Sequence, residues 1–167
     1  MSDNAVQLIH QFVDAKGIKD IDHWIEKYPH DQKQSAVMSA LMIVQDQQGY
    51  LSPESMDAVA EYLDMPNIAV YEVASFYSMY ALKPTGRHAV NVCTNVSCLL
   101  RDSAGVVRHL ENKLGIKLGE TTPDGRFTLK AVECLGACVN APMMQVDRDY
   151  HEHLTPERID AALEEYP

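Results

Sequence analysis

Four cysteines constrain what this chain can fold into more than any other feature of its sequence. Cys93, Cys98, Cys134 and Cys138 all lie in the second half of the 167 residues, as a C-x4-C pair and a C-x3-C pair separated by 35 residues. Each cysteine lies at or just after the end of an expected strand, where loops meet and side chains converge. Four converging thiolates are what an iron–sulfur cluster or a structural zinc ion requires.

The spacing of the cysteines separates the candidate metals only in part. Zinc knuckles are usually C-x2-C, with spacings up to four, whereas the looser pairs of this chain suit a two-iron cluster with one pair of ligands on each iron. The plant-ferredoxin and C-x2-C-x2-C-x3-C-P spacings are absent, and so is the C-x2-C of a thioredoxin-type redox pair. We therefore rank a [2Fe–2S] cluster first, zinc second, and cysteines that only pack as small hydrophobic residues third.

Charge and hydropathy exclude several classes of function. The formal net charge is −10, from 14 Lys and Arg against 24 Asp and Glu, whereas nucleic-acid binders concentrate basic residues to neutralise phosphates. No apolar run reaches the roughly 18–20 residues that span a bilayer, and the N-terminus has no secretion-signal pattern. We expect a cytoplasmic protein without a nucleic-acid partner, without direct insertion into the membrane and, in a reducing compartment, without disulfides.

The character of the sequence changes near Pro84-Thr85-Gly86. Before Leu82, helical spacings of apolar residues prevail and acidic residues outnumber basic ones; further on, short β-rich runs alternate with helices. Because Pro and Gly interrupt regular structure, a domain boundary is expected here. The predicted fold class is α+β, with a helical bundle over residues 1–82 and an α/β domain over residues 83–167.

Apolar periodicity and capping residues predict individual elements in both halves. Three or four helices are expected in the first half; one begins at Ser52-Pro53, and Asn67 is expected to cap another. In the second half, Gly115 is expected to end a helix. The expected strands and helices of that half cover residues 88–93, 102–114, 127–132 and 143–146, with a last helix from residue 155.

Three features of the backbone are expected near the two cysteine pairs. Gly136 favours a positive φ or a close approach of the backbone to bound sulfur. Backbone N–H groups in the loops 94–97 and 135–137 are expected to hydrogen-bond the sulfurs. For the Ala141–Pro142 peptide bond the trans form is expected on base rates, with a cis turn as the alternative.

Several segments, taken together, resemble one known family, the 24-kDa-type thioredoxin-like [2Fe–2S] ferredoxins that form the E subunit of NADH-quinone oxidoreductases (respiratory complex I). The resemblance covers roughly residues 35 to 165, and the cysteine-bearing segments are the most specific. The matching segments are CTNVSC (93–98), GETTPDGRFTL (119–129), VECLGAC (132–138), NAP (140–142) and LTPE (154–157), with ALMIVQ (40–45) and VASFY (73–77) in the helical half.

The resemblance implies a thioredoxin-like domain with one [2Fe–2S] cluster, whose ligands would be Cys93, Cys98, Cys134 and Cys138. It implies an electron-transfer component of the NADH-oxidising module, which belongs to an oxidoreductase but is not catalytic as an isolated chain. FMN and NADH would be bound by a neighbouring flavoprotein subunit, whose flavin exchanges an electron with the cluster. The other partners would be subunits of the peripheral arm, attached to the cytoplasmic side of the inner membrane.

Two further functions stay open at this point. Diaphorase-type subunits of NAD-linked hydrogenases and formate dehydrogenases keep the same four cysteines. In a different class, the chain would be a zinc-bound or purely structural module that docks a larger subunit. Iron content distinguishes the electron-transfer functions from the structural one.

Overall fold

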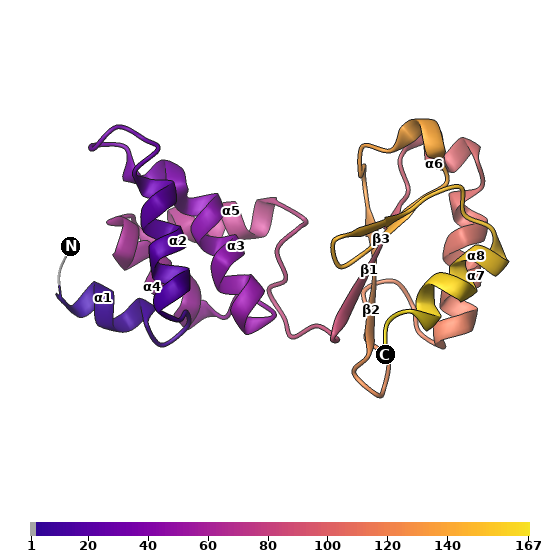
Figure 1. Ribbon diagram of the computed structural model, residues 1–167, viewed down its shortest axis with the longest axis horizontal. Coiled ribbons are helices and arrows are strands. Elements are labelled where there is room, and N and C mark those ends of the chain that lie inside the picture. The colour runs from indigo at the N-terminus through magenta and orange to yellow at the C-terminus, as the bar shows by residue number, and fades with distance from the viewer. Residues whose placement is uncertain (1–2) are drawn as a thin grey trace. The chain divides into compact units, whose positions relative to one another are not determined.

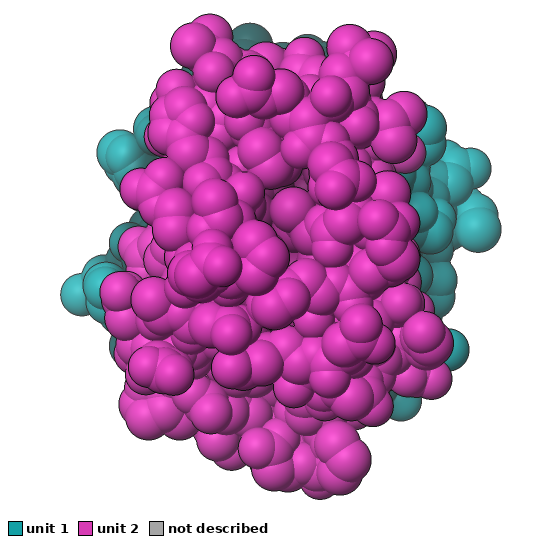
Figure 2. Space-filling model, turned by 90° about the vertical axis from the view of Figure 1, so that its right-hand side faces the viewer, with its two compact units in different colours: residues 1–84 teal, residues 85–167 magenta. Residues whose placement is uncertain are grey.

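A computed structural model describes residues 3–167, which form two compact units that divide after Pro84 (Figure 1). Unit 1 ends at Pro84 and unit 2 is Thr85–Pro167; Figure 2 colours them separately, with the surface of unit 2 toward the viewer. The sequence placed the boundary between residues 82 and 83, two residues earlier. Each unit has a hydrophobic core of its own.

Unit 1 is built from helices, as the apolar periodicity predicts. The helix expected at Ser52-Pro53 is confirmed, because the Ser52 side chain accepts the Ser55 N–H and Pro53 occupies the first turn. The helices of unit 1 are α1 (Asp3–Ile9), α2 (Ala15–Ile25), the 3-10 helix η1 (Lys33–Ala36), α3 (Val37–Gln48), α4 (Pro53–Leu63) and α5 (Asn67–Phe76).

The start of α5 differs from the expectation. Pro66 is its N-cap and Asn67 is already its first helical residue, so the expected cap by Asn67 is wrong. The Asn67 amide instead donates to the Asp57 carboxylate on α4, at 2.8 Å. Pro66 has no backbone N–H to donate, but its fixed φ suits the start of a helix.

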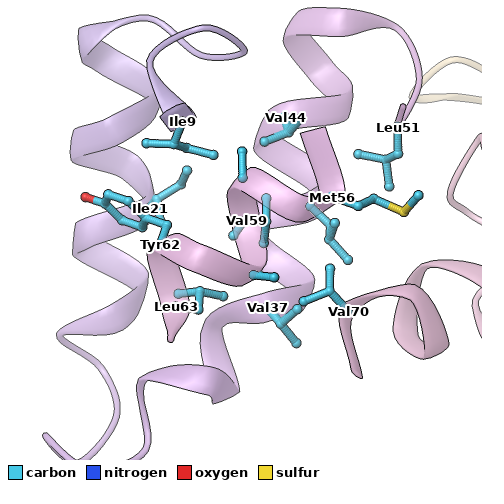
Figure 3. Packing of buried hydrophobic residues seen from close by; sticks show 14 of the residues in the cluster. Ile9, Ile21, Val37, Val44, Leu51, Met56, Val59, Tyr62, Leu63 and Val70 are labelled. Atoms are coloured by element: carbon cyan, nitrogen blue, oxygen red, sulfur yellow. The ribbon is translucent and has the colours of Figure 1, made fainter. Parts of the chain in front are cut away.

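The core of unit 1 forms where the apolar faces of these helices meet (Figure 3). Leu41 and Val44 of α3 and Val59 of α4 are completely buried, and each such side chain contributes about 1.5–3 kcal/mol by leaving water. Tyr62 is also buried, and its hydroxyl donates to the Asp22 carboxylate at 2.7 Å. The polar end of this large side chain therefore has a partner.

Unit 2 contains a four-stranded sheet in the order β2-β1-β3-β4. The pair β1 and β2 is parallel, whereas β3 runs antiparallel to β1 and β4 antiparallel to β3. The strands predicted at 88–93 and 127–132 are confirmed, the third begins one residue later than expected, and the fourth is too short for periodicity to indicate. The strands are β1 (His88–Cys93), β2 (Phe127–Val132), β3 (Met144–Val146) and β4 (Asp149–His151).

The helices α7 and α8 of unit 2 lie on the same side of the sheet (Figure 1). The predicted helix 102–114 is confirmed as α7, which ends at Gly115 with φ 68°, a backbone conformation that suits glycine. The five-residue α6 was not expected. The helices are α6 (Val96–Leu100), α7 (Ser103–Leu114), the 3-10 helix η2 (Cys138–Asn140) and α8 (Pro156–Glu164).

The described helices are short compared with a helix that spans a membrane. The longest described helices, α3 and α7, have 12 residues each, whereas a bilayer span needs about 20. Within residues 3–167, no helix is both long and apolar enough to cross a membrane.

Candidate metal centre

The parallel pairing of β1 with β2 brings the two cysteine pairs to one edge of the sheet. Cys93 is the last residue of β1 and lies opposite Val132, the last residue of β2. The Thr94 N–H then donates to the Val132 carbonyl at 2.9 Å, so the chain segments that follow the two strands begin side by side. Figure 1 shows α6 and the segment after β2 at the same end of unit 2. Cys134 follows two residues after Val132, so 35 intervening residues do not separate the pairs in space.

The first pair, Cys93 and Cys98, is buried, with 3% and 2% of each residue exposed. Both belong to a small apolar cluster with Met143, and the Cys93 N–H donates to the Met143 carbonyl at 3.3 Å. Cys98 lies on α6, whose N-cap Asn95 accepts the Val96 N–H at 2.7 Å. A strand end and a capped helix therefore hold these two sulfurs.

Burial changes the chemistry of the Cys98 thiol. Desolvation, together with a hydrogen bond to the Cys93 side chain, raises the pKa of Cys98 to about 11, although the Met143 amide acts in the opposite direction. The metal-free thiol is therefore protonated at neutral pH. Because metals bind thiolates, binding at this residue releases a proton.

The second pair, Cys134 and Cys138, is exposed, and its two Sγ atoms lie 4.0 Å apart. Gly136 between them has φ 83°, and a Cβ there would meet no atom within 4 Å. The backbone conformation, not lack of space, therefore favours glycine at this position. The Gly136 N–H donates to the Cys134 Sγ at 3.4 Å, so the expected amide-to-sulfur bond in the 135–137 loop is confirmed at this residue.

The segment after the second pair is tied to the turn that follows β4. The Asn140 amide donates to the Glu152 carboxylate at 2.8 Å, and the Leu154 N–H donates to the Pro142 carbonyl at 2.9 Å. The Ala141–Pro142 peptide bond is cis, so the trans bond expected from base rates is wrong.

Sequence reasoning missed one side chain that contacts the cysteine loop. Tyr150 on β4 donates its hydroxyl to the Leu135 carbonyl at 2.5 Å. This tyrosine lies 15 residues after Leu135 along the chain, and no motif or periodicity links the two. Only the hairpin of β3 and β4 brings it to the loop.

The chemistry and arrangement of the donors fit a [2Fe–2S] cluster. All four cysteines are free thiols, and the sulfurs lie as two pairs: Cys98 with Cys93 and Cys134 with Cys138. Over residues 3–167, no three or more His, Cys, Asp or Glu side chains form a group that could hold a metal ion. Two pairs of sulfurs suit a two-iron cluster in which each iron takes one pair as its ligands. Ligation by these residues stays a prediction.

Comparison with known proteins identifies relatives over most of the chain. The thioredoxin-like [2Fe–2S] ferredoxin family matches residues 21–167. The NADH-quinone oxidoreductase E 2 subunit of Rhizobium meliloti (strain 1021) is 47% identical over 148 residues, which cover 89% of this chain and 87% of that protein. The NADH-quinone oxidoreductase E subunit of Rickettsia felis is 45% identical over 154 residues, 92% of each chain.

A solved structure has a similar fold but a low sequence identity to this chain. The NAD+-reducing [NiFe]-hydrogenase in its air-oxidized state matches with a TM-score of 0.67 and 22% identity, over 78% of this chain and 22% of that chain. At this identity the similarity concerns the fold alone. Because the family matches most of the chain and close relatives match almost all of it, the chain belongs to the thioredoxin-like [2Fe–2S] ferredoxin family.

Proposed function

We propose that this chain is the electron-transfer subunit of the NADH-oxidising module of an NADH-quinone oxidoreductase, with one [2Fe–2S] cluster on Cys93, Cys98, Cys134 and Cys138. The observation that carries the proposal is the meeting of two distant cysteine pairs at one edge of the sheet. A bound [2Fe–2S] cluster supplies one-electron transfer. Relatives that are 47% and 45% identical carry the name of this component of the complex.

The residues around the sulfurs set the conditions for that electron transfer. The buried Cys93 and Cys98 keep water from one side of the site, whereas the exposed pair leaves the other side accessible to a redox partner. The amide dipoles of Gly136 and Met143 stabilise negative charge on the sulfurs. They would therefore raise the reduction potential of a bound cluster. The net charge of −10 on the chain opposes the negative charge that reduction adds to the cluster. It would therefore lower the reduction potential.

Large exposed apolar side chains lie on the two short helices that carry Cys98 and Cys138. We call them the apolar rim: Val96, Leu99 and Leu100 of α6 and Val139 of η2, of which Leu100 is 80% and Val139 95% exposed. These two helices lie close together. Exposed apolar side chains gathered at one place are typical of a protein interface. We infer that the flavoprotein subunit that binds FMN and NADH covers this rim, within the peripheral arm on the cytoplasmic side of the membrane.

The first experiment measures iron and acid-labile sulfide in anaerobically purified chain, with EPR spectra before and after dithionite. We expect about two irons and two sulfides per chain, no signal when oxidised and an S = ½ signal when reduced. Stoichiometric zinc, or no metal after reconstitution, would replace the electron-transfer function by a structural docking function.

A second experiment tests the partner. Leu100→Asp and Val139→Asp place charges in the rim, and each should weaken binding to the flavoprotein subunit at least about tenfold, because the carboxylate would be desolvated in the interface. Leu118→Asp is the matched control, since Leu118 is an exposed leucine of unit 2 outside the rim. Binding is measured by co-purification at equal cluster content. Equal losses in rim and control variants would contradict the assignment of this surface.

A further inference from the structure

Tyr150 and the sulfur of Cys134 contact opposite ends of one peptide unit. The Tyr150 hydroxyl donates to the Leu135 carbonyl at 2.5 Å. The N–H of the next residue, Gly136, donates to the Cys134 Sγ at 3.4 Å. The carbonyl of one residue and the N–H of the next lie in a single rigid plane, so a hydrogen bond that fixes the carbonyl also fixes the direction of the N–H.

The sheet determines where Tyr150 stands relative to the buried cysteines. Tyr150 on β4 pairs with Gln145 on β3, and Gln145 pairs with Asn91 on β1. Cys93 ends β1 only two residues later. The Tyr150 hydroxyl therefore connects the exposed cysteine loop to the sheet whose strand β1 ends at the buried Cys93.

The contact also has an electrostatic consequence. A donor on a carbonyl oxygen polarises the peptide and strengthens the N–H at its other end, as in other chains of hydrogen bonds. A stronger N–H stabilises negative charge on the sulfur that accepts it. One-electron reduction adds one negative charge to the cluster and its thiolates and breaks no bond, so such a donor favours the reduced state.

We propose that Tyr150 is a positioning residue of the redox site, which acts through the Leu135–Gly136 peptide to hold an N–H on the Cys134 sulfur and so raises the reduction potential of the bound cluster. This inference rests on the proposed function. Tyr150 is half-exposed, so its ring is not part of a closed core, and removal of the hydroxyl alone leaves the packing of unit 2 in place.

The test is Tyr150→Phe in the cluster-loaded full-length chain, with the potential measured by EPR-monitored titration against dithionite. We expect iron content to be unchanged and the ratio of reduced to oxidised cluster at a fixed potential to fall about threefold, which is about 28 mV at 59 mV per tenfold change. Tyr71→Phe is the matched control, because the Tyr71 hydroxyl also donates to a backbone carbonyl, that of Pro53 in unit 1, at 3.3 Å. It should leave the potential unchanged.

A graded replacement separates positioning from a merely structural role. With 3-fluorotyrosine at position 150 the hydroxyl is more acidic and donates more strongly, so the potential should rise above that of the natural chain. This variant keeps the ring and the hydroxyl, so it tests the positioning role of Tyr150 even where Tyr150→Phe fails to fold. Equal potentials for tyrosine, phenylalanine and fluorotyrosine at equal iron content would overturn the inference and leave the proposed function intact.

A cluster-independent measurement completes the test. In the metal-free chain, hydrogen exchange at the Gly136 amide should speed up several-fold in Tyr150→Phe. The reason is that the Leu135–Gly136 peptide loses the hydrogen bond from the Tyr150 hydroxyl. Unchanged exchange at Gly136 would contradict the positioning role. Absence of iron in the natural chain would instead overturn the proposed function, and the effect on the potential with it.

Discussion

The two cysteine pairs of this chain have similar spacing and opposite surroundings. Cys93 and Cys98 come from a strand end and a helix and are buried in a small apolar cluster. Cys134 and Cys138 come from a loop and the first residue of a 3-10 helix and are exposed. Hydrogen bonds hold the exposed loop, whereas apolar packing together with hydrogen bonds holds the buried pair.

This difference indicates that the two pairs contribute differently to one site. The buried pair is part of a small apolar cluster, and we expect it to keep its arrangement without metal. The exposed pair depends on a few hydrogen bonds, each with a net contribution of about 0.5–1.5 kcal/mol, and lies next to the apolar rim. On the proposed function, the first pair would anchor the cluster in the domain, and the second would present it to the partner.

The largest effect is expected when any one of the four cysteines is replaced by serine. A hydroxyl is a harder and poorer ligand for iron than a thiolate, so iron binding should weaken by more than the roughly 10–100-fold that loss of an outer-sphere partner costs. Iron analysis and visible absorbance measure this. Unchanged iron and absorbance in all four variants would contradict the ligand assignment.

The same variants should differ once the metal is removed. Cys98→Ser replaces a weakly polar thiol in the buried cluster by a more polar hydroxyl, and burial of that hydroxyl should lower the free energy of unfolding by about 1–3 kcal/mol. Cys138→Ser at the exposed position should stay within about 0.5 kcal/mol. Urea denaturation of the metal-free chains makes the comparison. Equal stability losses would show that the pairs do not differ as described.

Met143→Ala should affect the buried pair selectively. Met143 is 1% exposed and packs with Cys93 and Cys98, so its truncation should lower the free energy of unfolding by about 2–5 kcal/mol. Leu135→Ala is the control, because Leu135 is only partly buried beside the same cluster, and it should cost less. Thermal denaturation followed by circular dichroism measures both.

Alkylation of the metal-free chain should distinguish the pairs without any mutation. Cys134 and Cys138 are exposed and should react with iodoacetamide at least about tenfold faster than Cys93 and Cys98, which must first become accessible by local opening. Burial also raises the pKa of the Cys98 thiol and so lowers its thiolate fraction. Mass spectrometry of timed samples follows each cysteine. Similar rates at all four would mean that the buried pair is not held by the fold.

A moderate effect, confined to the exposed loop, is expected at Gly136. Gly136→Ala retains space for the added methyl group but must adopt φ 83°, a left-handed conformation that costs an L-residue about 1–2 kcal/mol. The loss should appear mainly as faster release of iron from the loaded chain, because the strain lies in the exposed loop. Gly119→Ala, at φ 88° and also in open space, controls for strain outside the site and should leave iron release unchanged.

Local sequence patterns predicted much of the fold and four candidate cysteine ligands, whose role as ligands stays a prediction. The strands ending at Cys93 and Val132, the cap at Ser52 and the end of α7 at Gly115 all depend on neighbouring residues and are confirmed. Three features were not predictable in this way. The helix α6 and the strand β4 are too short for periodicity, and the isomer of the Ala141–Pro142 bond depends on its surroundings rather than on its own two residues.

The sequence by itself therefore determined the two-part organisation, the α+β class and the four thiols, because composition, capping and periodicity act over a few residues. Only the tertiary structure decided that Cys93 and Cys98 are buried while Cys134 and Cys138 are exposed, and that Tyr150 reaches the Leu135 carbonyl. These arrangements depend on the register of β1 with β2 and β3, which joins residues far apart in the chain. The pairing of whole strands sets such register, and no short segment encodes it.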